Sequence, residues 1–218
     1  MQLEGAVINF LGDSITEGAG ASCVENRYTD VLARMYGLKK ANNYGIGGTR
    51  IARQRVVTDS PFDLDYCMRC REMDESADAV VVFGGTNDYG HGDAPIGGPK
   101  DRTPATFYGA CHDLMSTLQT RYVGKPVLVV TPLRRADEEN PFGDGSKEKP
   151  GEILRVYRDI ILEVAFAYSL PVLDLYATSG IQPTNPVVIE RLLPDGLHPN
   201  DAGHALLARR IGEALKLL

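Results

Sequence analysis

Residues 79–88 read AVVVFGGTND, a run of five apolar residues, most of them β-branched, that stops at two glycines. An uninterrupted apolar run of this length, bounded by turn residues, is typical of a strand buried on both faces of a parallel sheet. Asn87 and Asp88 then follow the carboxyl end of that strand. Open parallel sheets bind ligands at this end, so we expect a ligand site beside Asn87.

Similar apolar runs and helical stripes alternate along the rest of the chain. The other predicted strands are residues 6–11, 41–45, 127–131 and 171–175. The predicted helices are residues 28–36, 64–73, 106–122, 152–169 and 202–217. This alternation is typical of βα units around a parallel sheet. With no linker or repeat in between, the sequence predicts one α/β domain over residues 1–218.

Composition excludes several classes of partner. The chain has 218 residues and a net charge of −6, and its lysines and arginines do not cluster, which argues against nucleic acid. Its beginning lacks the cationic segment of a signal peptide, and no apolar run approaches the roughly 18 residues of a membrane span. We therefore expect a cytoplasmic protein that binds no membrane, with homo-oligomerisation left open.

The four cysteines indicate neither a metal site nor a redox site. Cys67 and Cys70 form a lone CxxC motif inside a helix-like segment, without a second pair or suitably spaced histidines. At helical spacing we interpret them as partly buried free thiols. No other set of His, Cys and Asp has ligand spacing, so we expect no metal and no cofactor.

The residues needed for acyl transfer stand near opposite ends of the chain. Ser14 follows the first predicted strand, and Asp195 and His198 precede the last predicted helix. A hydroxyl becomes a useful nucleophile when an imidazole takes its proton and a carboxylate orients that imidazole. Taken alone, Ser14 also fits a helix N-cap and His198 a solvated loop residue.

Two further groups strengthen the catalytic interpretation. Gly48 follows the second predicted strand, and Asn87 follows the third. A glycine lets the backbone approach a substrate closely, and an amide donates N–H groups without charge. Because all of these residues follow or precede elements of one sheet, we expect them to meet at one edge. Asp13 and Asp88 are interpreted as carboxylates that support their own loops.

These motifs resemble those of the SGNH hydrolases, the GDSL-type esterase/lipase family, over nearly the full length of the chain. The matching blocks are Gly12-Asp13-Ser14-Ile15, Asn43-x4-Gly48, Gly85-Thr86-Asn87-Asp88 and Asp195-x2-His198, with Ile15 where the family name implies Leu. The resemblance implies a flavodoxin-like fold of three layers.

The same resemblance implies a role for each matched residue. Ser14 would be the nucleophile, His198 the general base and Asp195 its orienting partner. The Ser14 N–H, the Gly48 N–H and the Asn87 side-chain amide would form the oxyanion hole. Other hydrolase and nucleotide motifs, namely GxSxG, Walker A and GxGxxG, are missing from the sequence.

The expected substrate is a short acyl ester, with an acetyl group on a small or carbohydrate-type alcohol as the preferred case. Two long segments, residues 89–104 and 132–151, are polar and rich in Gly and Pro, unlike the entrance of a lipase for long chains. His91 and Arg50 are candidate substrate-binding residues. The alternatives are an acyltransferase or thioesterase with the same triad, and a non-catalytic carbohydrate-binding protein.

Overall fold

The computed structural model describes residues 1–218 and contains one parallel sheet of five strands. In chain order the strands are β1 (Val7–Gly12), β2 (Lys40–Gly45), β3 (Ala79–Phe83), β4 (Val127–Val130) and β5 (Val172–Leu173). They lie side by side in the order β2-β1-β3-β4-β5, which is the order of flavodoxin-like sheets. The predicted α/β fold with about five parallel strands is confirmed.

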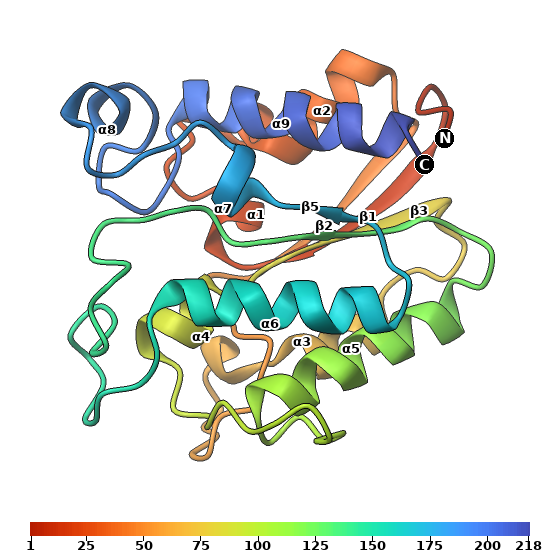
Figure 1. The fold of residues 1–218 in the computed structure, drawn as a ribbon. Coiled ribbons are helices and arrows are strands. Elements are labelled where there is room, and N and C mark those ends of the chain that lie inside the picture. Colours follow the sequence, from red (N-terminus) through yellow and green to blue (C-terminus); the bar gives the residue numbers. More distant parts are fainter.

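Helices cover both faces of this sheet, as Figure 1 shows. One face packs against α2 (Tyr28–Tyr36) and α9 (Asp201–Lys216). The other packs against α3 (Tyr66–Arg69), α5 (Phe107–Arg121) and α6 (Leu154–Ala167). Because side chains alternate along a strand, Phe10 and Leu11 of β1 enter different apolar clusters, one on each face. The fold therefore has three layers.

Several short helices stand outside the predicted elements. They are α1 (Ser14–Glu17), α4 (Thr86–His91), α7 (Leu175–Thr178), α8 (Pro186–Leu192) and the 3-10 helices η1 (Val24–Asn26) and η2 (Pro61–Asp63). A further 3-10 helix, η3 (Cys70–Glu72), lies within a predicted helix. Each spans one or two turns, which is too short for an apolar period to register in the sequence. The helix predicted over 64–73 is resolved into α3, which Asp65 caps, and η3.

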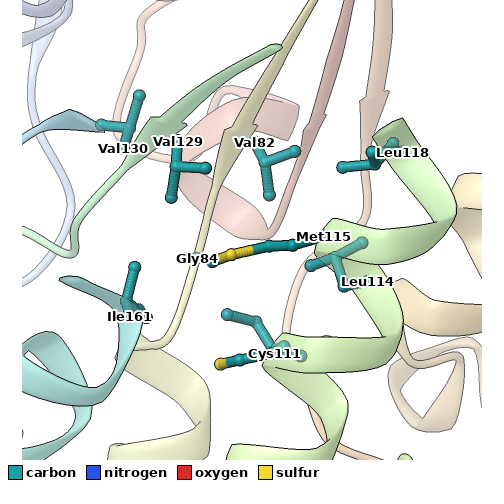
Figure 2. Close-up of a pocket in the computed structure, with 10 residues that line it drawn as sticks. Val82, Gly84, Cys111, Leu114, Met115, Leu118, Val129, Val130 and Ile161 are labelled. Atoms are coloured by element: carbon teal, nitrogen blue, oxygen red, sulfur yellow. The ribbon is translucent and has the colours of Figure 1, made fainter. Parts of the chain in front are cut away.

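The apolar layer between the sheet and α5 is closely filled. Figure 2 shows a gap in it, a cavity of about 10 Å³ between β3, β4, α5 and α6. Met115 and Cys111 point into it from α5, and Ile161 borders it from α6. A space of this size holds a single water at most, so this layer is core and not a binding site.

Cys67, Cys70 and Cys111 are buried free thiols, and Cys23 is exposed. No helix of the protein is long and apolar enough to cross a lipid bilayer.

Two buried carboxyl groups lie at the carboxyl end of the sheet. Asp13 accepts a hydrogen bond from the Ile15 N–H at 3.0 Å. Asp88 accepts from the N–H groups of Ile51 and Ala52, each at 2.9 Å. Burial raises the pKa of both carboxyls to about 6, although these backbone hydrogen bonds act in the opposite direction. Asp13 thus supports its own loop, as interpreted from the sequence, whereas Asp88 holds a different segment, the one that follows Gly48.

The contribution of the core can be tested with a matched pair of phenylalanines. Phe10 of β1 is 0% exposed, whereas Phe166 of α6 is 86% exposed. We expect Phe10→Ala to lower the free energy of unfolding by about 3–5 kcal/mol, because it removes a buried ring and leaves a cavity. Phe166→Ala should change it by less than about 0.5 kcal/mol. Urea unfolding measures both, and equal losses would contradict the burial assigned here.

A second stability test uses the raised pKa of Asp13. The folded state holds the Asp13 proton more tightly than the unfolded state between the ordinary value of 3.8 and about 6. The contribution of Asp13 to the unfolding free energy therefore falls as pH rises through this window. Asn can also cap α1 but carries no charge, so Asp13→Asn should gain stability over the wild type by on the order of 2–3 kcal/mol between pH 4 and pH 7.

The control for this experiment is Asp59→Asn, at an exposed aspartate. Its difference from the wild type should stay constant over the same pH range. Urea titrations at several pH values measure both variants. A stability difference for Asp13→Asn that does not change with pH would contradict the burial of an ionisable group at this position.

Candidate active site

The register of the sheet brings three loops together at its carboxyl edge. Gly12 at the end of β1 is paired with Gly45 of β2 on one side and with Phe83 of β3 on the other. The three strands therefore end at the same level. Ser14, Gly48 and Asn87 follow these ends by two, three and four residues.

Ser14 is the first residue of α1, and its hydroxyl is not used as a cap. The N-cap is Asp13, whose carboxylate accepts the Ile15 N–H. The Ser14 Oγ instead lies 3.0 Å from Nε2 of His198. The simpler interpretation of Ser14 as an N-cap is therefore wrong, because the preceding aspartate fills that position.

Asp195 holds the His198 ring by its other nitrogen. The Asp195 Oδ2 lies 2.7 Å from His198 Nδ1, and its Oδ1 accepts the N–H groups of Leu197 and His198 at 2.8 and 2.6 Å. Partial burial alone would raise the pKa of Asp195, but these hydrogen bonds outweigh it and hold the pKa below its ordinary value. An ionised Asp195 keeps the proton on Nδ1, so Nε2 faces the Ser14 hydroxyl as an acceptor.

The loop that carries His198 packs against the segment that follows α1. Gly20 has φ of +87°, and a Cβ there would lie 2.2 Å from the Pro199 carbonyl oxygen. His204, fully buried, donates from Nε2 to the Ala19 carbonyl at 3.1 Å and accepts the Tyr28 N–H at Nδ1 at 3.2 Å. Burial lowers the pKa of His204 and favours the neutral form that this pattern requires.

Three N–H groups at this edge are free to bind an anionic oxygen. The N–H groups of Ser14 and Gly48 have no acceptor within the protein. Asn87 donates one side-chain hydrogen to the Thr49 carbonyl at 3.0 Å, which leaves its second hydrogen free. Gly48 has φ of +74°, a backbone conformation that favours glycine, and a Cβ there would lie 2.9 Å from the Phe62 ring.

Arg69 joins the ends of two strands to the loop that holds Asn87. Its buried guanidinium donates to the Gly12 carbonyl at 3.0 Å, to the Tyr44 carbonyl and to the Thr49 hydroxyl at 2.7 Å. These bonds satisfy carbonyl groups that end β1 and β2. The sequence interpretation missed Arg69, which lies between the two cysteines of the CxxC motif, because the nearby Arg71 and Glu72 are also charged and nothing in the sequence distinguishes Arg69 from them.

The two candidate substrate-binding residues occupy different positions. His91, the last residue of α4, has Nε2 3.1 Å from the Gly48 carbonyl oxygen and Nδ1 3.3 Å from Oδ2 of Asp144. It therefore lies at the edge of the candidate site. Arg50 is buried and forms an ion pair with Asp63 at 2.6 Å. Its guanidinium stabilises the segment that follows Gly48 and does not face a free surface.

A polar cleft of about 650 Å³ begins at His91. Residues 55–56, 91–96 and 146–152 line it, together with Tyr157 of α6. The walls thus come largely from the two long polar segments of the sequence, residues 89–104 and 132–151. Residues 89–91 of the first segment form the end of α4. No three or more His, Cys, Asp or Glu side chains gather into a group that could hold a metal ion.

Comparison with known proteins agrees with the family resemblance of the sequence motifs. The GDSL-like lipase/acylhydrolase family matches residues 10–206, whereas curated protein sequences give no match. A solved structure from Lactobacillus plantarum is 30% identical over 99% of this chain and 98% of that chain, with a TM-score of 0.83. A lipase/acylhydrolase from Enterococcus faecalis is 25% identical over 97% and 95%, with a TM-score of 0.64.

A larger and more distantly similar enzyme shares the fold over about half of its length. A two-domain esterase active on acetylated mannans is 23% identical, with a TM-score of 0.63, over 99% of this chain and 49% of that chain. The family match, in contrast, covers most of the sequence and includes every predicted site residue from Ser14 to His198. The chain therefore belongs to the GDSL-like lipase/acylhydrolase family and is a carboxylic ester hydrolase.

Proposed function

We propose that the protein is a serine esterase that hydrolyses short acyl esters, acetyl esters above all, of small or carbohydrate-type alcohols through an acyl-enzyme. Ser14 is the nucleophile, His198 the general base and Asp195 the residue that orients it. The observation that carries this proposal is the line of contacts from Ser14 Oγ to His198 Nε2 and from His198 Nδ1 to Asp195, at 3.0 and 2.7 Å. Three free N–H groups beside that line complete the support.

In the first half of the reaction His198 takes the Ser14 proton while Oγ bonds to the ester carbonyl carbon. The carbonyl oxygen becomes an oxyanion, and the N–H groups of Ser14, Gly48 and Asn87 bind it. When the tetrahedral intermediate collapses, the protonated His198 gives its proton to the departing alcohol oxygen. In the second half, water loses a proton to His198 and attacks the acyl carbon. The bond between Ser14 Oγ and that carbon then breaks, His198 returns the proton to Oγ, and the acid is released.

The surroundings of Ser14 favour a short acyl group. The Phe62 ring covers Gly48, and the large opening nearby is a cleft lined mainly by polar and charged residues. A long acyl chain needs a broad apolar surface, and neither this cleft nor the buried cavity of about 10 Å³ offers one. Activity on acetylated mannans belongs to a protein that shares the fold at 23% identity, so the acetyl preference proposed here is argued from this lack of an apolar surface.

The nucleophile is tested by Ser14→Ala. Without the hydroxyl no acyl-enzyme forms, so hydrolysis of p-nitrophenyl acetate should fall at least about 1,000-fold and labelling by a fluorophosphonate should disappear. Ser116→Ala, at an exposed serine of α5, should retain both. Full labelling of the Ser14→Ala variant would overturn the assignment, because another residue would then be the nucleophile.

The oxyanion donor is tested by Asn87→Ala. An interaction made mainly in the transition state affects kcat more than KM, so we expect kcat to fall about 100- to 1,000-fold with KM nearly unchanged. Steady-state kinetics with p-nitrophenyl acetate measures both constants. Asn185→Ala, which removes the cap of α8 at an exposed position, is the matched control and should keep kcat. A rise in KM with an unchanged kcat would show that Asn87 only binds substrate.

A further inference from the structure

Two neighbouring cations have no ion pair, and one of them, Lys147, lines the polar cleft. The Lys147 ammonium lies over the rings of Tyr89 and Tyr157, at 5.4 and 5.6 Å from their centres. The buried Arg135 guanidinium lies 5.4 Å from the centre of the same Tyr89 ring. No carboxylate lies within salt-bridge distance of either, and the Arg135 Nε has no hydrogen-bond partner.

The acidic residues around these cations are engaged elsewhere or lie at the rim. Asp144 accepts hydrogen bonds from Ser146 and contacts His91. Asp93 accepts the N–H groups of Arg55 and Val56. Glu148 and Glu152 line the cleft at exposed positions, as do Arg55 and Lys149. Lys147 is therefore the one half-buried cation in the cleft lining, with an ammonium that has three donors and no protein acceptor.

Burial also makes the charge of Lys147 costly. It lowers the pKa of the ammonium, and the neighbouring Arg135 acts in the same direction, while Asp88 and Asp144 oppose it. An anion bound beside the ammonium would supply the missing partner and restore its charge. A neutral hydroxyl would satisfy the donors but would leave the two like charges uncompensated.

His91 connects this cleft to the reaction centre. One of its ring nitrogens contacts the Gly48 carbonyl, and the other contacts the Asp144 carboxylate. Both partners only accept hydrogen bonds, so both contacts are hydrogen bonds only when the ring carries two protons. Because His91 both contacts Gly48 and lines the cleft, one end of the cleft lies next to the candidate oxyanion hole.

We propose that the cleft beginning at His91 binds the alcohol portion of the ester, and that Lys147 selects alcohols that carry a carboxylate or phosphate group. This inference rests on the proposed esterase function and specifies its substrate. The alternative is that Lys147 only packs the segment after β4 against the rings of Tyr89 and Tyr157. Methionine has a similar length and also packs on aromatic rings, so Lys147→Met separates charge from packing.

The test compares matched acetyl esters. The anionic substrates are 4-acetoxybenzoate and 4-acetoxyphenyl phosphate, and the neutral substrate is methyl 4-acetoxybenzoate. Lys147→Met should raise KM about tenfold for the anionic esters, because it removes a charge-assisted hydrogen bond, and should leave the neutral ester within about twofold. Lys147→Arg keeps the charge and should restore much of the loss. The two anionic esters show whether carboxylate or phosphate is preferred.

The control is Lys100→Met, at an exposed lysine outside the cleft lining. It should leave KM for every ester unchanged. An equal effect of Lys147→Met on neutral and anionic esters would overturn the inference, because Lys147 would then act only through packing. So would a wild-type enzyme whose KM is no lower for the anionic esters than for the neutral one.

A binding measurement separates this inference from the proposed function. Calorimetric titration of the wild type and of Lys147→Met with 4-hydroxybenzoate needs no turnover, and Lys147-dependent binding supports the site. Ser14-dependent hydrolysis without any effect of Lys147 would overturn the inference alone. Lys147-dependent binding without Ser14-dependent hydrolysis of any ester would overturn the proposed function and leave the anion site standing.

Discussion

The arrangement of the site depends on the in-register ends of three parallel strands. Gly12 of β1 is hydrogen-bonded into the sheet between Gly45 of β2 and Phe83 of β3, so three chain segments leave the sheet at one level. Each segment needs only a few residues to bring its functional group to the same point. A shift of one strand along its neighbour by one residue would move its loop by about 3.3 Å, which is enough to break a hydrogen bond of about 2.9 Å.

Buried charge is concentrated at this edge and not in the middle of the sheet. Asp13, Asp88 and Arg69 are all nearly inaccessible to solvent, and each forms hydrogen bonds with backbone groups of the segments around the site. Burying such groups is costly unless their hydrogen bonds are made. Here the hydrogen bonds of these buried groups fix the loops before Ser14 and after Gly48. The burial of the charged groups is unfavourable by itself, but their hydrogen bonds hold the site in one geometry. Reactive groups that are held in advance need no reorganisation when the oxyanion forms.

Much of the fold was predictable because a strand that is buried on both faces of a sheet consists of a continuous run of apolar residues in the sequence. β3 and β4 agree closely with the predicted segments, whereas β5 contains only two residues of the five expected. The short helices α1 and α4 were not predicted, since one or two turns show no period. The convergence of Ser14, Gly48 and Asn87 could be expected from the rule that parallel strands share one carboxyl edge.

Partners far apart in the sequence could not be predicted in this way. Arg50 was a candidate for substrate binding, yet the fold pairs it with Asp63. Arg69 and His204 looked unremarkable in sequence, because their importance depends on carbonyl groups that only the tertiary structure brings to them. The same holds for Lys147, whose lack of a carboxylate partner is a property of the folded cleft.

The central claim is that the Ser14 hydroxyl and three N–H donors surround one point. A crystal structure with a small alkylboronic acid tests it directly, because boron bonded to a serine oxygen adopts the tetrahedral shape of the intermediate. The account predicts a bond between boron and Ser14 Oγ, with one boronate oxygen within hydrogen-bond distance of the Ser14 N–H, the Gly48 N–H and the Asn87 amide. A boronate bound elsewhere, or one on Ser14 whose oxygens face none of these donors, would contradict it.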